Sequence, residues 1–231
     1  MKTIGLLGGM SWESTALYYK LINEGIRKEL GGLHSAQIAM YSVDFHPLEQ
    51  LMAEGNWKEL EKHLCQYATQ IEKGGADFLL ICTNTMHKLA DQIQGAISIP
   101  LLHLADATAE KVKSEKKNTI GLLGTKVTMT EDFYKGRLIE QHGLNVVTPS
   151  DDDMDIVDRI IFDELCKGIV SEESRIEYQR IIGTLQEQGA KGIILGCTEI
   201  CMLVGPGDVD IQLFNTTDIH AEAAVRMALK I

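Results

Sequence analysis

Short runs of apolar residues, each bounded by turn-forming residues, recur along the whole chain. Runs of this length without polar alternation are typical of strands that are buried on both faces, as in parallel sheets. They predict strands at residues 3–7, 37–43, 78–82, 99–102, 119–123, 145–147, 192–195 and 212–214.

Segments with apolar residues at helical spacing lie between these runs. In residues 11–29, Leu17, Leu21 and Ile26 fall near one face of a helix. Residues 56–73 begin with Asn56 and a glutamate three positions later, which is the spacing of a capping box. The alternation of strands and helices predicts an α/β fold in which helices pack on both faces of parallel sheets.

Two pairs of segments repeat in the same order at nearly the same offset. TIGLLGG at 3–9 matches TIGLLGT at 119–125, and FLLICTNTM at 78–86 matches GIILGCTEI at 192–200. The repeat predicts two pseudo-symmetric α/β lobes with the active site between them. Because chain termini often lie close together, we expect the first lobe to comprise residues 1–98 plus about 208–231, and the second lobe residues 99–207.

The composition of the chain argues against two classes of binding partner, nucleic acids and membranes. The net charge of −11 argues against nucleic acid, whose binding rests on clustered lysine and arginine. No apolar run approaches the roughly 20 residues that span a bilayer, and Met1 leads directly into a predicted strand. We therefore expect a cytoplasmic protein without a membrane partner. Its five cysteines form no spaced framework, which favours free thiols.

The repeated segments also locate the candidate chemistry. Ligands of open parallel sheets bind beyond the carboxyl ends of the strands, where all four repeated segments end. The repeat aligns Thr83 with Cys197. If the lobes face each other across an approximate two-fold axis, these two side chains oppose each other across one site.

Cys197 is a candidate base. It follows a predicted strand and precedes residues 200–203, which are suited to a first helical turn. Backbone N–H groups at such a position lower the pKa of a thiol from about 8.5. A buried structural cysteine is the alternative interpretation.

Two acid/base groups on opposite sides of a carbon suit racemisation, in which a proton leaves one face and returns on the other. Oriented donors would stabilise the enediolate-like carboxylate that develops. Helix capping is the alternative role for each candidate donor. The candidates are Ser11, Ser14, Asn84, Thr85, Thr125, Thr128 and Thr198.

Four segments together resemble the aspartate/glutamate racemase family: GLLGGMSWEST at 5–15, CTNTMH at 82–87, GLLGT at 121–125 and GCTEI at 196–200. The resemblance implies a cofactor-independent isomerase, usually a homodimer, that acts on a small dicarboxylic amino acid. In the family pattern each lobe offers one cysteine. Cys197 matches the second, but Thr83 stands in the place of the first. Cys82 is expected to point away, because side chains alternate along a strand.

This departure implies an asymmetric reaction, since a hydroxyl scarcely ionises without a neighbouring base. By the resemblance, Cys197 removes the α-proton of L-aspartate or L-glutamate, and Thr83 or a water that it holds returns one. Lys167, in ELCKG, resembles the family's lysine-containing region and is the candidate cation for the side-chain carboxylate, with His46 as a second candidate. The remaining substrate-binding candidates are Met10, Ser11, Asn84, Thr85, Thr125, Thr128, Thr198 and Glu199.

Other interpretations have weaker support. Residues 5–9 lack dinucleotide spacing and a P-loop lysine. Cys197 with Cys201, or His63 with Cys65, lacks further metal ligands, and no Schiff-base lysine for pyridoxal phosphate is identifiable. We therefore expect neither metal nor cofactor. A non-catalytic amino-acid sensor and a related cysteine-dependent isomerase or decarboxylase stay open as alternatives. His87 and His103 are expected to be hydrogen-bonded structural residues.

Overall fold

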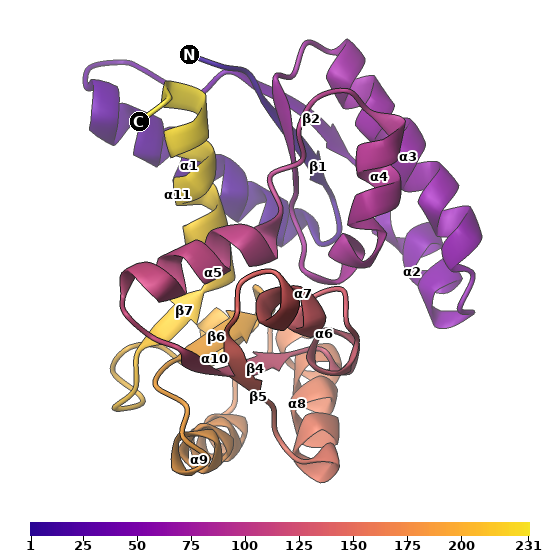
Figure 1. Cartoon of the computed structure of the whole chain (residues 1–231). Coiled ribbons are helices and arrows are strands. Elements are labelled where there is room, and N and C mark those ends of the chain that lie inside the picture. Colours follow the sequence, from indigo (N-terminus) through magenta and orange to yellow (C-terminus); the bar gives the residue numbers. More distant parts are fainter. The chain divides into compact units, whose positions relative to one another are not determined.

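The computed structural model describes residues 1–231, which divide into two compact units. Unit 1 comprises residues 1–104 and 220–231, and unit 2 comprises residues 105–219. Each unit is built around one parallel sheet with helices packed on it (Figure 1). The predicted α/β class with parallel sheets is therefore confirmed.

Unit 1 contains a three-stranded sheet in the order β2-β1-β3. Its strands are β1 (Ile4–Gly8), β2 (Ile38–Ser42) and β3 (Phe78–Ile81). Its helices are α1 (Trp12–Leu30), α2 (Phe45–Ala53), α3 (Trp57–Lys73), the short 3-10 helix η1 (Thr85–Leu89), α4 (Ala90–Ala96) and the part of α11 (Thr216–Leu229) from residue 220 onward.

Strands β1 and β3 of unit 1 are buried on both faces because their alternate residues enter two separate cores. Leu7, Leu79 and Ile81 pack with residues of α3 and α4. Leu6 and Leu80 pack on the opposite face with residues of α1 and α11. Figure 1 shows α1 and α11 together on one side of this sheet and α3 on the other. Continuous apolar strands are thus explained by helices on both faces.

Unit 2 contains a four-stranded sheet in the order β5-β4-β6-β7. Its strands are β4 (Thr119–Gly124), β5 (Asn145–Val147), β6 (Ile193–Gly196) and β7 (Leu213–Asn215). Its helices are α5 (Leu104–Ser114), which begins one residue before the unit boundary, α6 (Lys126–Thr130), α7 (Lys135–Glu140), α8 (Asp151–Asp163), the 3-10 helix η2 (Leu165–Lys167), α9 (Glu172–Glu187) and α10 (Ile200–Leu203).

The two sheets repeat the same local topology. The order β2-β1-β3 in unit 1 corresponds to β5-β4-β6 in unit 2. The matched strands are also paired similarly, since Leu7 aligns with Ile81 and Leu123 aligns with Leu195. The repeated sequence segments therefore build equivalent strand pairs.

Two features of the fold differ from the sequence-based expectation. Residues 99–102 form no strand but one isolated bridge, between Leu79 and Leu101. Pro100 within this segment has no N–H to donate to a ladder. Residues 208–219 belong to unit 2 and not to the first lobe, because β7 pairs with β6 in register Ile193 to Leu213. The unit changes at 104/105 and 219/220, whereas we expected changes at 98/99 and about 208.

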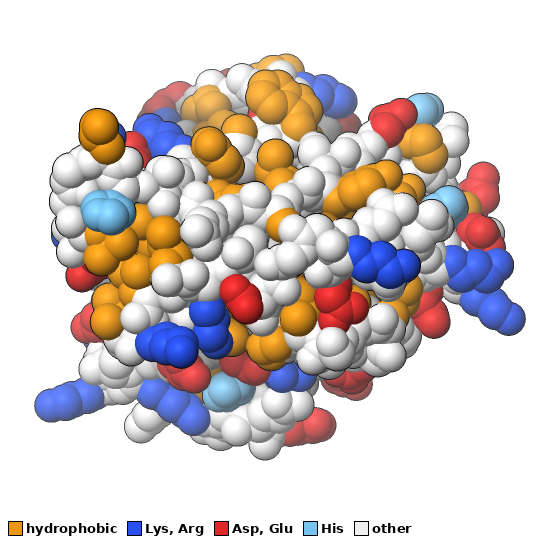
Figure 2. All heavy atoms as spheres, turned by 90° about the horizontal axis from the view of Figure 1, so that it is seen from above, with side chains coloured by type: hydrophobic (Ala, Val, Ile, Leu, Met, Phe, Trp, Pro, Cys, Tyr) orange, Lys and Arg blue, Asp and Glu red, His pale blue; other side chains and the backbone are white.

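Charged side chains of both signs lie interspersed on the face shown in Figure 2. Among the ion pairs of the whole chain are those of Arg180 with Asp153 and of Lys111 with Glu115. None of the helices combines the length and the apolar character that a membrane span requires.

Candidate active site

The loop that joins β1 to α1 begins the site in unit 1. The Gly9 N–H donates to Thr15 Oγ1 at 2.8 Å, and the same hydroxyl donates to the Ser11 carbonyl at 2.9 Å. Gly9 has a φ of +93°, and a Cβ there would lie 2.4 Å from the Val43 backbone. A glycine is therefore required at this position, both for its conformation and for the close approach of the chain.

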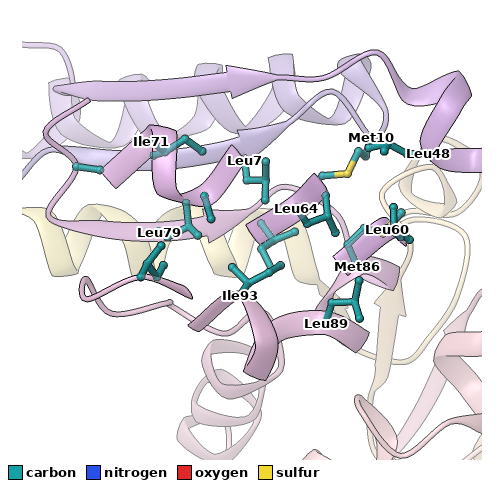
Figure 3. Close-up of a cluster of buried hydrophobic side chains, with 14 residues drawn as sticks. Leu7, Met10, Leu48, Leu60, Leu64, Ile71, Leu79, Met86, Leu89 and Ile93 are labelled. Carbon is teal, nitrogen blue, oxygen red and sulfur yellow. The ribbon is translucent and has the colours of Figure 1, made fainter. Parts of the chain in front are cut away.

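Two candidate ligand-binding residues of this loop have structural roles. Met10 is 4% exposed, and its side chain lies in the hydrophobic core beside Leu7 and Leu48 (Figure 3). A contact between Met10 and substrate stays a prediction. Ser11 is the N-cap of α1, and its Oγ accepts from the Ser14 N–H at 3.3 Å.

The second loop of unit 1 follows β3 and is tied to the first. Ser14 Oγ donates to the Cys82 carbonyl at 3.0 Å, which brings the start of α1 beside the end of β3. The Cys82 side chain is fully buried in the core that faces α1 and α11, as expected from side-chain alternation. Burial raises the pKa of the Cys82 thiol far above its ordinary range. Cys82 is therefore unsuited to act as a base.

The residues after Cys82 carry the candidate polar groups. Thr83 and Thr85 are half-buried, and Asn84 is buried at 4% exposure. Thr85 begins η1. The structure thus keeps Thr83, Asn84 and Thr85 together at the carboxyl end of β3, beside the first turn of α1, which contains Ser14.

In unit 2 the loop after β4 holds two threonines. Thr125 is the N-cap of α6, and its Oγ1 lies 3.0 Å from Thr128 Oγ1. Both side chains are buried. Gly124 is in register with Gly196 on β6, so Thr125 and Cys197 leave neighbouring strands side by side. The predicted grouping of Thr125, Thr128 and Cys197 within one unit is present.

A thiol and a carboxylate meet at the end of β6. Cys197 Sγ donates to Glu199 Oε2 at 3.0 Å, and Thr198 Oγ1 donates to the same oxygen at 2.7 Å. All three residues are half-buried. A carboxylate that already accepts the thiol hydrogen is placed to take that proton completely.

The pKa of Cys197 is shifted in the direction opposite to our expectation. Burial raises the pKa well above its ordinary value, and the negative charge and hydrogen bond of Glu199 add to the rise. The helix that follows, α10, is a single turn of four residues, and its first N–H group, on Ile200, already bonds to the Cys197 carbonyl at 3.3 Å. Without a proton acceptor, the Cys197 thiol therefore stays protonated near neutral pH.

The two candidate cations are both exposed. Lys167 ends η2, which packs against α10, and its Nζ lies 3.4 Å from an Asp163 carboxylate oxygen. His46 lies in the first turn of α2 in unit 1, and its backbone N–H bonds to Asp44. Lys167 therefore lies in the same unit as Cys197, whereas His46 does not.

Two residues that hold these loops were not singled out as site residues from the sequence. Thr15 fixes Gly9 and Ser11, as described above, and His87 Nδ1 lies 2.8 Å from the Thr83 carbonyl oxygen. The sequence signal for His87 is its position four residues after Thr83, just inside a helical turn. In the 231 residues, no group of three or more histidine, cysteine, aspartate or glutamate side chains is arranged to hold a metal ion.

Two α/β units that repeat one strand order, each with a polar loop after the matching strand, define a racemase-type architecture. A family model described as Asp/Glu/Hydantoin racemase matches residues 7–224. The chain therefore belongs to this family, and it is an isomerase of the amino-acid racemase type.

Individual relatives support this assignment. A proposed Asp/Glu racemase of known crystal structure from Yersinia pestis is 53% identical, with a TM-score of 0.95 over 99% of this chain and 100% of that one. PH1733, an aspartate racemase homologue from Pyrococcus horikoshii OT3, is 34% identical, with a TM-score of 0.86 over 99% of this chain and 100% of that one. The broad specificity amino-acid racemase RacX of Bacillus subtilis is 24% identical over 96% of both chains.

Proposed function

We propose that the protein interconverts the enantiomers of aspartate or glutamate without a cofactor and prefers the L-enantiomer as substrate. One observation carries the proposal: in a racemase-family chain, the Cys197 thiol at the end of β6 donates a hydrogen bond to the Glu199 carboxylate. The family resemblance also supports a homodimer as the working form.

In the proposed reaction, Glu199 takes the thiol proton of Cys197 and leaves a thiolate. The thiolate removes the α-proton of the L-amino acid, so that the C–H electron pair passes into an enediolate. The hydrogen bond between Cys197 and Glu199 is stronger in half-buried surroundings than in water, so it keeps the carboxylate in place as the acceptor of the thiol proton. Glu199 regains its charge when it passes the proton to solvent.

Thr83 is proposed to serve the opposite face of the same carbon. Its hydroxyl, or a water that it holds, donates a proton to the enediolate and gives the D-enantiomer. The alkoxide or hydroxide left behind then takes a proton from solvent, which balances the proton that Glu199 releases. A neutral hydroxyl is a competent hydrogen-bond donor but a poor base, so the reverse abstraction from a D-substrate is slower. Equal turnover of D- and L-substrates would contradict this part of the proposal.

The surrounding hydroxyl and amide groups are proposed to bind the carboxylates. Donors aimed at the α-carboxylate stabilise it as negative charge develops during proton removal. Lys167 is the proposed partner of the side-chain carboxylate, which requires it to leave Asp163. The proposed carboxylate-binding residues are Ser11, Asn84, Thr85, Thr125, Thr128 and Thr198.

Solvent deuterium exchange tests the proposal directly. In D2O and without added cofactor, the protein should introduce deuterium at the α-carbon of L-aspartate or L-glutamate, as followed by proton NMR. Cys197→Ala should lower this exchange by about 1,000-fold or more, because the base that makes the carbanion is lost.

Cys201→Ala is the matched control, since this half-buried cysteine lies four residues further on, in α10, and should exchange like the wild type. Binding of L-aspartate without any exchange would instead support the amino-acid sensor. Release of CO2 would support a decarboxylase. Exchange with neutral amino acids but not acidic ones would contradict the proposed substrate class.

A further inference from the structure

Three histidines are clustered within unit 1, and the proposed proton transfers use none of them. His87, His103 and His220 are all buried, at 5% exposure or less. The ring centroid of His87 lies 4.6 Å from that of His103 and 5.9 Å from that of His220. Burying three imidazoles is costly unless their ring nitrogens are hydrogen-bonded, so their partners indicate what they do.

His87 links the loop that carries Thr83 to the start of α5. Its Nε2 accepts from the Leu104 N–H at 3.2 Å, so this nitrogen carries no hydrogen. The hydrogen of the neutral ring is therefore on Nδ1, which donates to the Thr83 carbonyl at 2.8 Å. One neutral tautomer satisfies both hydrogen bonds. In a doubly protonated ring, Nε2 would carry a hydrogen that points at the Leu104 N–H, and that hydrogen bond would be lost.

His220 anchors the other side of the same segment. Its Nε2 donates to the Leu102 carbonyl at 2.8 Å, and its Nδ1 accepts from the Tyr18 hydroxyl at 2.9 Å. The segment from Leu102 to Leu104 is thus held by an imidazole at each end. A continuous set of hydrogen bonds and covalent links runs from α1 through α11 to His87 and ends on the Thr83 backbone.

We propose that His87 is a positioning residue that fixes the Thr83 backbone so that the Thr83 hydroxyl reaches the α-carbon. This inference rests on the proposed racemase function. Thr83 is two residues past the end of β3 and lacks a strand ladder of its own, and the bond from Nδ1 supplies a fixed point for it. Geometry matters here because a misplacement of about 1 Å can cost up to about 100-fold in rate.

Two isosteric variants separate the two hydrogen bonds of His87. In His87→Asn the side-chain amide nitrogen lies near the place of Nδ1 and can still donate to the Thr83 carbonyl. In His87→Gln the amide oxygen lies near the place of Nε2 and can still accept from Leu104, but the donor to Thr83 is lost. The proposal predicts that only the glutamine variant disturbs Thr83.

The readout is the ratio of inversion to exchange with L-aspartate in D2O. Inversion needs the Thr83 side, whereas deuterium return to the L-enantiomer needs only Cys197. We expect His87→Gln to lower the ratio about tenfold or more while L-exchange stays within about threefold of wild type. His87→Asn should keep the ratio within about twofold.

Tyr18→Phe is the control for a purely structural role, because it removes a buried hydroxyl from the same network without touching Thr83. It should lower stability and leave the ratio unchanged. An unchanged ratio in His87→Gln, or an equal fall in His87→Asn or Tyr18→Phe, would overturn the inference. If the glutamine variant does not fold, a fall of about tenfold in His87→Asn, which keeps the donor to Thr83, would overturn the inference. A wild-type protein with no exchange would overturn the proposed function as well.

Discussion

The loops after β3 and β6 come from one repeated segment, yet they hold their acid/base candidates by different atoms. In unit 2 the sulfur of Cys197 is itself hydrogen-bonded to the Glu199 carboxylate. In unit 1 the backbone carbonyl of Thr83, and not its side chain, accepts a hydrogen bond from the neutral imidazole of His87. Equivalent strand ends can therefore hold their residues differently, and in the proposed reaction one unit controls a proton while the other controls a position.

The first way to test this contrast is to remove the proton acceptor while keeping its shape. Glu199→Gln should lower α-proton exchange about 100-fold, which is within the usual contribution of a general acid/base group. Burial is the largest cause of the raised Cys197 pKa and persists in the variant. The thiolate must then form by direct ionisation, so the remaining rate should rise with pH through the alkaline range.

Glu187→Gln, at the exposed end of α9, is the matched control and should leave the rate and its pH profile unchanged. A Glu199→Gln enzyme with the wild-type rate at neutral pH would mean that the Cys197 proton leaves by another route. The pH–rate profile of L-substrate exchange measures both outcomes.

A second test makes the two loops more alike. Thr83→Cys places a thiol where the family resemblance expects one, and a thiol ionises far more readily than a hydroxyl. We expect turnover of D-aspartate or D-glutamate to rise about tenfold relative to the L-enantiomer. Thr83→Ser keeps a hydroxyl and should give no such rise. An unchanged enantiomer ratio in Thr83→Cys would show that the asymmetry has another source.

A smaller effect separates the two units by their response to acid. Burial lowers the pKa of His220 in unit 1 to about 3, and electrostatic repulsion by His87 adds to this decrease. The hydrogen bond to the Leu102 carbonyl acts in the opposite direction and raises the pKa. The unfolded chain binds this proton near pH 6.5, so stability should fall as the pH decreases from about 6.5 toward 3, by at most about 1.4 kcal/mol per pH unit.

In unit 2, Asp106 responds in a lower range. Burial opposes its ionisation, but hydrogen bonds from Arg137 and His142 outweigh burial and lower its pKa below the ordinary value near 3.8. Its contribution is therefore present above about pH 3.8 and is lost below it. Urea titrations at several pH values should give a flatter pH dependence for His220→Gln, whereas His34→Gln on the surface should match the wild type.

Much of the fold could be predicted because local patterns determine it. The apolar runs gave the strands of both sheets to within about a residue, and Asn56 accepts from the Glu59 N–H as its capping-box position predicts. The pairing of β7 was not predictable in the same way, because it depends on which strand the segment meets, and the apolar pattern of a short run does not contain that information. The segment at 99–102 was predicted from its apolar residues alone, although Pro100 argues against a strand there.

The candidate site was less predictable, for a physical reason. Sequence spacing identified the loops, and alternation correctly directed Cys82 into the core. We predicted a lowered pKa for Cys197, and this prediction was wrong. The shift depends on burial and on where the Glu199 side chain lies. The burial of Met10 was not predicted for a similar reason: its neighbours in the sequence are polar loop residues, but in space it belongs to the same hydrophobic core as Leu7 and Leu48.

The place of α11 in unit 1 has a consequence for how the protein is made. Residues such as Ala224 and Val225 complete the core that covers β1 and β3, and the Lys2 N–H bonds to the Ala228 carbonyl. During translation, the first strands emerge from the ribosome long before this helix exists. Until α11 is made, α1 alone covers that apolar face of the nascent sheet, and in that interval we expect its exposed part to be prone to aggregation.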